Sequence, residues 1–239
     1  MHRGKRLDYL GMTMDFKEKG KCRVTMDGYI TDLMKFCSDI EGVAKTPASD
    51  SLFKIDKDSK VLEKFERERF HTITAKLLYL GKRVRPDILT AIAFLTKRVQ
   101  QPVQQDMDKL ERVIRYIRGT QNLGIILEGS KNLAVYGYID ASYGIHADLK
   151  SHTGCVIGIG KGPVFAKSST QKLNTKSTSC EAELVGLSDS TGMIIWTRNF
   201  LIEQGYPMGA ATFAKRTHTY RWNFVSVCAD HNTSHCDDG

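Results

Sequence analysis

The chain has 239 residues, of which 41% are hydrophobic and 26% charged, and its formal net charge is +8. This composition is that of a globular protein with enough chain for one or two domains. No apolar run approaches the ~18 residues of a membrane-spanning helix, and no apolar stretch follows the basic N-terminus, so we expect neither a membrane protein nor a secretory signal sequence. The six cysteines are scattered along the chain, which favours free thiols in a reducing compartment, the cytoplasm or the nucleus.

The positive charge is concentrated in one segment. Residues 61–120 contain 13 Lys and Arg and 7 Asp and Glu, and so carry +6 of the +8. Basic segments of this kind occur in proteins that bind polyanions. They also occur as the solvated face of a helix, and charge alone favours that simpler interpretation.

In chain order, the first predicted elements are two strands and a helix. Residues 8–16 (DYLGMTMDF) and 21–26 (KCRVTM) have the composition of strands, and KEKGK between them predicts a hairpin turn. Residues 27–37 predict a helix, because Ile30, Leu33 and Met34 share one face. Residues 45–60 are polar and contain Pro47, so we expect a connecting loop.

Three helical stretches follow. Their apolar residues recur at helical spacing: Phe70, Ile73, Leu77 and Leu80 in the first, Ile88, Ala91, Ile92 and Leu95 after Pro86 in the second, and Met107, Leu110, Ile114 and Ile117 in the third. The third stretch runs from about Gln104 to Gly119. Its arginines Arg112, Arg115 and Arg118 lie away from the apolar stripe, which predicts a basic outer face.

The pattern changes in the second half of the chain. Residues 133–140 (LAVYGYID) predict a strand, and residues 154–169 predict a hairpin around Gly160, Lys161 and Gly162. Helical periodicity then runs from Thr178 to about Gln204. The apolar face of this helix is predicted to contain Leu184, Leu187, Ile194, Ile195 and Leu201. Three strands followed by one long helix predict an α+β unit.

Three carboxylates near these elements could carry chemistry. Glu181 and Glu183 are two positions apart, so a helix turns them ~200° from each other. Thr178 and Glu181 have the spacing of a capping box, a structural task, whereas Glu183 lies at the edge of the apolar face and must be paired or used. Asp140 ends a strand, where acids more often cap turns. On the residues alone, a shared metal site is the less favoured interpretation, because two Mg²⁺ ions need several convergent carboxylates.

An ordered series of motifs resembles a known family. RVRPDILTAIAFLTKRV, KLERVIRYIRGT, LAVYGYIDASYG, SHTGCVIGIGKGPVFAKSSTQK and STSCEAELVGLSDS follow one another over roughly residues 8–209. Together they resemble the polyprotein of copia-type long-terminal-repeat retrotransposons, in which a reverse transcriptase precedes a ribonuclease H.

The resemblance implies an α+β chain in four parts. Residues 1–50 would be the C-terminal part of the reverse transcriptase palm, with a β-hairpin, and the paired catalytic aspartates of the polymerase would precede residue 1. Residues 51–130 would be thumb and connection helices. Residues 131–210 would be a truncated ribonuclease H-like domain, a three-stranded antiparallel sheet with a long helix, and residues 211–239 an aberrant, disordered tail.

The resemblance also implies the site residues. Asp140 and Glu183 match the first two members of the Asp-Glu-Asp-Asp set that holds two Mg²⁺ ions, and we expect them as catalytic and metal-binding residues of an incomplete site. The expected partner is an RNA–DNA hybrid or another nucleic-acid duplex, contacted by the basic helices. The expected contact residues are Lys82, Arg83, Arg85, Arg112, Arg115 and Arg118.

The family pattern is lost after FLIEQGYPMGAAT. The family continues with a strand that ends in Asp-Asn, but this chain continues FAKRTHTYRWNFVSVCADHNTSHCDDG, as a shift of reading frame or a spliced foreign end would produce. Asp189 comes too early to be the third site acid, and Asp230 lacks the family context. Four potential zinc ligands, Cys228, His231, His235 and Cys236, are too compressed along the chain for the usual paired spacing.

Three functions stay open at this point. We expect a catalytically inactive remnant that retains nucleic-acid binding. The alternatives are a metal-dependent ribonuclease H, which further acids near Asp140 would favour, and a non-catalytic nucleic-acid-binding module, which salt-sensitive duplex binding would favour. Association with an intact polyprotein is undecided.

Overall fold

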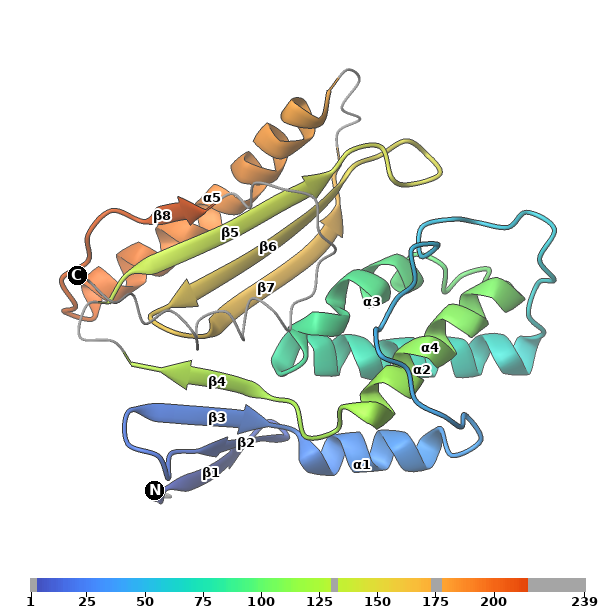
Figure 1. The fold of residues 1–239 in the computed structure, drawn as a ribbon, viewed down its shortest axis with the longest axis horizontal. Helices are drawn as coiled ribbons and strands as arrows, with labels where there is room; N and C mark the ends of the chain where they lie inside the picture. The colour runs from blue at the N-terminus through green and yellow to red at the C-terminus, as the bar shows by residue number, and fades with distance from the viewer. Residues whose placement is uncertain (1–3, 130–132, 173–177, 215–239) are drawn as a thin grey trace, which may run out of the picture.

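The computed structural model describes residues 4–129, 133–172 and 178–214, and forms two four-stranded sheets with helices beside them (Figure 1). We call residues 4–129 the helical unit and residues 133–214 the strand unit. The overall class is α+β, as predicted. Within the described residues, no helix is both long and apolar enough to cross a membrane.

The helical unit combines a sheet with a group of packed helices. Its elements are β1 (Arg6–Tyr9), β2 (Met12–Asp15), β3 (Lys21–Thr25), α1 (Asp27–Phe36), α2 (Lys64–Arg83), the 3-10 turn η1 (Pro86–Ile88), α3 (Leu89–Thr96), α4 (Gln104–Gly119) and β4 (Ile125–Glu128). The apolar stripes of α2, α3 and α4 form its core, and the predicted stripe residues of α2 are fully buried. At the start of α2, Glu66 accepts a hydrogen bond from the Glu63 amide, which satisfies one of the free donors of the first turn.

Residues 8–16 form two strands, not the single strand that we predicted. Tyr9 of β1 pairs with Met12 of β2, so only Leu10 and Gly11 make the turn. Both turn residues have positive φ, 50° and 74°, as a tight hairpin of this kind requires. Glycine adopts a positive φ without steric cost. Leucine rarely adopts a positive φ, so the Leu-Gly pair gives no turn signal in the sequence.

The fourth strand of this sheet comes from much later in the chain. β4 pairs antiparallel with β3, with Cys22 opposite Leu127, and the strand order is β1-β2-β3-β4. One buried cluster extends from Val24 in β3 to Ile117 in α4. The described residues of the segments 1–50 and 51–130, which we predicted as separate parts, share one sheet and one hydrophobic core.

The strand unit contains β5 (Val135–Ser142), β6 (His152–Ile159), β7 (Pro163–Thr170), α5 (Ser179–Glu203) and β8 (Thr212–Ala214). The antiparallel order β5–β6–β7 and the hairpin around Gly160, Lys161 and Gly162 agree with the prediction. β8 adds a fourth strand, parallel to Tyr136–Tyr138 of β5. The sheet therefore extends into the segment predicted as a disordered tail, and residues 215–239 lie outside the described residues.

α5 has the predicted bounds but presents a different face to the sheet. The buried positions are mostly small: Ala182, Gly186, Ser190, Ile194 and Thr197. A Cβ added at Gly186 would lie 3.2 Å from Thr153 and 3.6 Å from the Cβ of Ala141, so the helix lies close against β5 and β6. Of the predicted face, Leu184 and Ile195 are 63% and 49% exposed. The close approach selects small residues, which a search for large apolar side chains overlooks.

The two units meet along β4 and β7. Glu128 and Lys161 exchange two backbone hydrogen bonds of 2.8 and 3.2 Å. Gly162 has a φ of 104°, and a Cβ at this position would collide with the carbonyl oxygen of Ile126. The described cysteines, Cys22, Cys37, Cys155 and Cys180, carry free thiols.

Candidate functional site

Asp140 lies on β5 at the edge of the strand-unit sheet. It is half-buried and pairs with Gly154 of β6 on one side. On its other side, the pairing with β8 ends at Tyr138. Within the described residues, the outer edge of β5 is thus unpaired at Asp140, and its carboxylate has a route to solvent there.

Glu181 and Glu183 occupy the first turns of α5. The amide of Glu181 donates to the hydroxyl of Thr178 at 3.2 Å, which is the Thr178 half of the predicted capping box, and the Glu181 side chain is exposed. Glu183 is half-buried. The preceding carbonyl, that of Ala182, accepts a 2.6 Å hydrogen bond from the side chain of Gln171, which ties this turn to the end of β7.

The packing of α5 sets where the two candidate ligands lie. Gly186, one turn after Glu183, rests on Ala141, the neighbour of Asp140. Because successive side chains of a strand point to opposite faces, Asp140 points away from the face that α5 covers. A metal ion held by both carboxylates would have to lie at the open edge of β5. The described residues contain no group of three or more His, Cys, Asp or Glu placed to hold a metal ion.

Arg85 is enclosed by the helical unit and does not face solvent. Its side chain is 1% exposed, forms an ion pair with Asp87 at 2.7 Å, and donates to the hydroxyl and carbonyl of Thr120. Its guanidinium also lies 5.3 Å from the ring centre of Tyr116, whose phenol pKa burial raises to about 12. The prediction that Arg85 contacts nucleic acid is corrected, because a duplex cannot reach this group.

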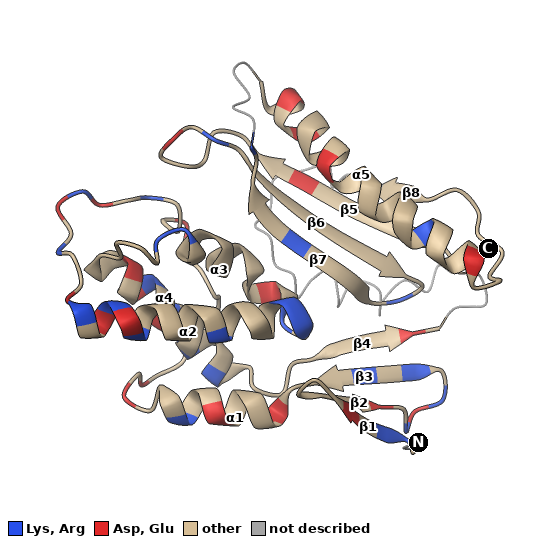
Figure 2. Cartoon of the chain, turned by 180° about the vertical axis from the view of Figure 1, so that it is seen from behind, with Lys and Arg blue, Asp and Glu red and all other residues tan. Residues whose placement is uncertain are grey.

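The three arginines of α4 are engaged within the chain. Arg112 donates to Thr46, Arg115 to the carbonyl of Glu41, and Arg118 to the carbonyls of Cys37 and Ile40. All three thus bind the segment after α1 onto α4. Their role at a duplex stays a prediction, but these hydrogen bonds give them a structural task. Figure 2 shows that acidic residues lie among the basic ones on the helices. The net charge of residues 61–120 therefore overestimates the positive charge that is free to bind a duplex.

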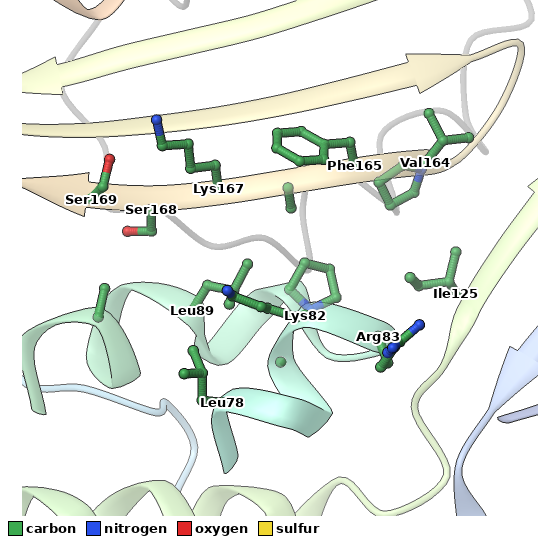
Figure 3. A pocket seen from close by; sticks show the side chains of 15 residues that line it. Leu78, Lys82, Arg83, Leu89, Ile125, Val164, Phe165, Lys167, Ser168 and Ser169 are labelled. Atoms are coloured by element: carbon green, nitrogen blue, oxygen red, sulfur yellow. The ribbon is translucent and has the colours of Figure 1, made fainter. Parts of the chain in front are cut away.

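A groove between the two units gathers the remaining basic candidates. It has a volume of about 470 Å³ and lies between the end of α2, α3 and the edge strand β7 (Figure 3). Lys82, Arg83 and Lys167 line it, and its lining contains no acidic residue. Its apolar wall includes Leu78, Leu89 and Ile125. Sequence reasoning missed Lys167, because a lone lysine on a strand carries no signal until β7 is placed opposite α2.

The tail candidates for metal binding, Cys228, His231, His235 and Cys236, lie outside the described residues, as does Asp230. The zinc hypothesis and the lack of a recognisable third site acid therefore stay predictions for these positions.

Comparison with known proteins finds several transposon proteins among the relatives. The chain is similar to the retrovirus-related Pol polyprotein from transposon RE1 of Arabidopsis thaliana (31% identity over 137 residues, 57% of this chain and 9% of that protein). It is also similar to the Pol polyprotein from transposon TNT 1-94 of Nicotiana tabacum (28% identity, 57% of this chain and 10% of that protein). A putative transposon Ty5-1 protein of Saccharomyces cerevisiae is 26% identical over 192 residues, 78% of this chain and 61% of that protein.

The predicted resemblance to retrotransposon polyproteins is confirmed by these relatives, although the chain spans about a tenth of the length of the Pol polyproteins themselves. No family model matches the chain. Among solved structures, a foamy viral protease-reverse transcriptase in complex with dsDNA aligns with 91% of this chain and 46% of that one, at 10% identity and a TM-score of 0.49.

Proposed function

We propose that this chain, whose relatives include retrovirus-related Pol polyproteins of transposons, is a fragment of such a polyprotein that binds nucleic acid without cleaving it. The binding site would be the groove between α2, α3 and β7. Its ligand would be a nucleic-acid duplex, such as an RNA–DNA hybrid.

The charge of the groove is the observation that carries the proposal. Three basic side chains line the groove, and no acidic residue belongs to its lining. Several other Lys and Arg side chains of the segment 61–120 are instead paired with acids or backbone carbonyls. Lys and Arg side chains in such a position bind phosphates and release the counterions of the nucleic acid. Arg83 lines the groove, and its guanidinium lies over the ring of Tyr79, 5.3 Å from the ring centre.

Loss of cleavage is proposed from the chemistry of the carboxylates. Phosphodiester hydrolysis by two Mg²⁺ ions needs several oxygen ligands that hold both ions. Asp140 and Glu183 suit Mg²⁺ as ligands but are only two groups, and the described residues contain no group of three or more His, Cys, Asp or Glu placed to hold a metal ion. This donor set does not fit a two-metal centre, and Mg²⁺ binding remains only what the resemblance implies.

A second candidate function is ribonuclease H activity. The contact of Gly186 with Ala141 favours it, because this contact brings the turn that carries Glu183 to the edge where Asp140 lies. Metal-dependent cleavage that is lost in Asp140→Asn would establish this function.

The binding proposal predicts a specific salt dependence. We expect the Kd for a fluorescent RNA–DNA duplex to rise steeply with salt. Lys82→Ala, Arg83→Ala and Lys167→Ala together should lower the log–log slope by about 2–3, at about 0.9 per phosphate contact. Measurement of Kd by fluorescence anisotropy over a series of salt concentrations checks this result.

A charge-matched control separates the groove from net charge. Lys35, Lys57 and Lys60 are exposed and lie outside the groove lining, so their triple alanine variant loses the same three charges. This variant should keep the slope of the unmodified chain. Equal slopes for the groove variant and the control variant would refute the groove as the binding site.

A further inference from the structure

A buried cluster of polar side chains lies where the strand unit meets α3. Four of its members belong to the strand unit: His146 from the loop after β5, His152 from β6, and Ser168 and Thr170 from β7. The fifth, Thr90, belongs to α3 of the helical unit, which runs beside β7 (Figure 1). Both histidines are buried, at 7% and 6% exposure.

Hydrogen bonds connect these side chains in a chain. His146 Nε2 lies 3.0 Å from His152 Nδ1, and His152 Nε2 lies 2.7 Å from Ser168 Oγ. Ser168 in turn donates to Thr90 Oγ1 at 3.2 Å, across the junction between the two units. Thr170 Oγ1 lies 2.9 Å from His146 Nε2.

The direction of this chain follows from its last member. Because Ser168 gives its proton to Thr90, its oxygen accepts from His152 Nε2, and the neutral His152 ring has its lone pair on Nδ1. His146 Nε2 then donates to that lone pair. This tautomer assignment rests on the network. A proton added to His152 would place two N–H groups against each other over the 3.0 Å contact.

An aromatic side chain of the helical unit closes the cluster. The ring of Phe53 lies 5.0 Å from the His146 ring and 5.4 Å from the His152 ring, between centres. Phe53 also packs edge-on against Phe94 of α3 at 5.7 Å. The two imidazoles are therefore covered by the helical unit, and a charged imidazole there would lose its hydration.

We propose that His146 and His152 form a proton-sensitive latch that holds the strand unit against the helical unit, closed while both rings are neutral and released when a ring is protonated. Ser168 belongs both to the latch and to the lining of the groove, so release of the latch loosens one groove wall.

The surroundings of the rings disfavour a positive charge. Burial, with smaller effects of His146 and Lys97, lowers the pKa of His152 to about 3. Burial also lowers the pKa of His146, helped by Lys97 and Lys150 and opposed by Asp148. The described charged groups that act on the two rings are Lys97, Asp148 and Lys150. Lys97 follows α3, and Asp148 and Lys150 lie in the loop before β6.

The sign of the pH effect follows from these lowered pKa values. The open state binds protons with the ordinary histidine pKa of about 6.5, and the closed state binds them only at lower pH. The latch is therefore complete above about pH 6.5 and weakens as the pH falls below it. For His152 alone, the equilibrium constant for opening rises about 30-fold between pH 7.5 and pH 5.

Hydrogen–deuterium exchange of the full chain tests the proposal. Amides on both sides of the latch, in residues 144–151 and 51–56, should lose about 30-fold in protection between pH 7.5 and pH 5 after correction for the intrinsic exchange rate. The amides of residues 110–117 in the α4 core should keep their protection. The double variant His146→Gln/His152→Gln, in which both side chains retain a donor and an acceptor but neither titrates, should abolish the response.

The exposed His71 of α2 supplies the matched control. His71→Gln should respond to pH as the unmodified chain does, and a pH response that persists in His146→Gln/His152→Gln overturns the latch. If the double variant fails to fold, NMR titration of the histidine rings in the unmodified chain decides. Two rings with pKa values lowered from the ordinary value of about 6.5 support the latch, and ordinary titration of all rings overturns it.

Discussion

Arg85 is the largest of the fully buried side chains in the described part of the molecule. Its planar guanidinium makes three hydrogen bonds to the carboxylate of Asp87 and two to Thr120, so it connects the start of η1 to the end of α4. A buried charge is tolerated only with such partners, because its hydration has been lost. The position is structural, even though its sequence context, LGKRVRP, is that of a basic cluster.

We expect Arg85→Ala to lower the free energy of unfolding by about 3–5 kcal/mol, because it leaves the Asp87 carboxylate, 11% exposed, without its partner. Arg85→Lys should recover only part of the loss, since an ammonium group cannot bind Asp87 and Thr120 in the same plane. Urea unfolding measures both values. Lys82→Ala, at an exposed position of α2, is the control and should change stability by less than about 0.5 kcal/mol. Equal stability of the Arg85 and Lys82 variants would contradict this assignment.

At the scale of single elements, α5 depends on small residues at the sheet and carries large ones outside. Gly186 packs on Thr153, and Ile194 fills the space above Gly137 of β5. On the outer surface, the rings of Trp196 and Phe200 stack at 5.4 Å. The helix is therefore apolar around most of its circumference, and its buried face is set by the fit to β5 and β6.

The same substitution at two glycines of α5 should have opposite effects. Gly186→Leu should destabilise the fold by about 1–3 kcal/mol or more, because its side chain must displace Thr153 and Ala141. Gly192→Leu should stabilise it by about 0.5–1 kcal/mol, since no atom lies within 4 Å of a Cβ there and leucine has the better helix propensity. Thermal or urea unfolding of the two variants provides the measurement. A stabilising Gly186→Leu would show that α5 does not rest on the sheet through this residue.

At the scale of the whole molecule, two units share a junction that contains the backbone pair Glu128–Lys161, the histidine latch and the basic groove. β4 connects them, since it completes the sheet of the helical unit and leads into the strand unit. The groove therefore exists only when both units are in place. Asp140 and Glu183 belong to the strand unit alone.

We expect no measurable cleavage of an RNA–DNA hybrid by the purified chain in Mg²⁺ or Mn²⁺, because two carboxylates cannot fix both ions of a two-metal reaction. Replacing the segment after Thr212 by the continuation typical of the resembled family should restore cleavage. Asp140→Asn should then abolish it again. Product analysis on denaturing gels provides the readout. Cleavage by the unmodified chain that disappears in Asp140→Asn would reinstate the ribonuclease H function.

The sequence by itself determined the elements that local periodicity specifies. The stripe from Phe70 to Leu80, the end of α4 at Gly119 and the β6–β7 hairpin were all predicted, because helix and hairpin signals lie within a few residues of one another. The order of motifs also determined the kinship with retrotransposon polyproteins, since a series of motifs at fixed distances is far more specific than any single one.

Only the tertiary structure decided which charges are free and which faces are buried. In the sequence, Arg85 and Arg118 cannot be told from Lys82 as free basic residues. In the structure, Arg85 donates to Thr120. Arg118 donates to Cys37 and Ile40, and these partners come from segments distant in the chain. The same holds for β4, which pairs with β3 across about a hundred residues, and for the small-residue face of α5. The physical reason is that burial and pairing depend on non-local contacts, whereas periodicity reports only on the segment that carries it.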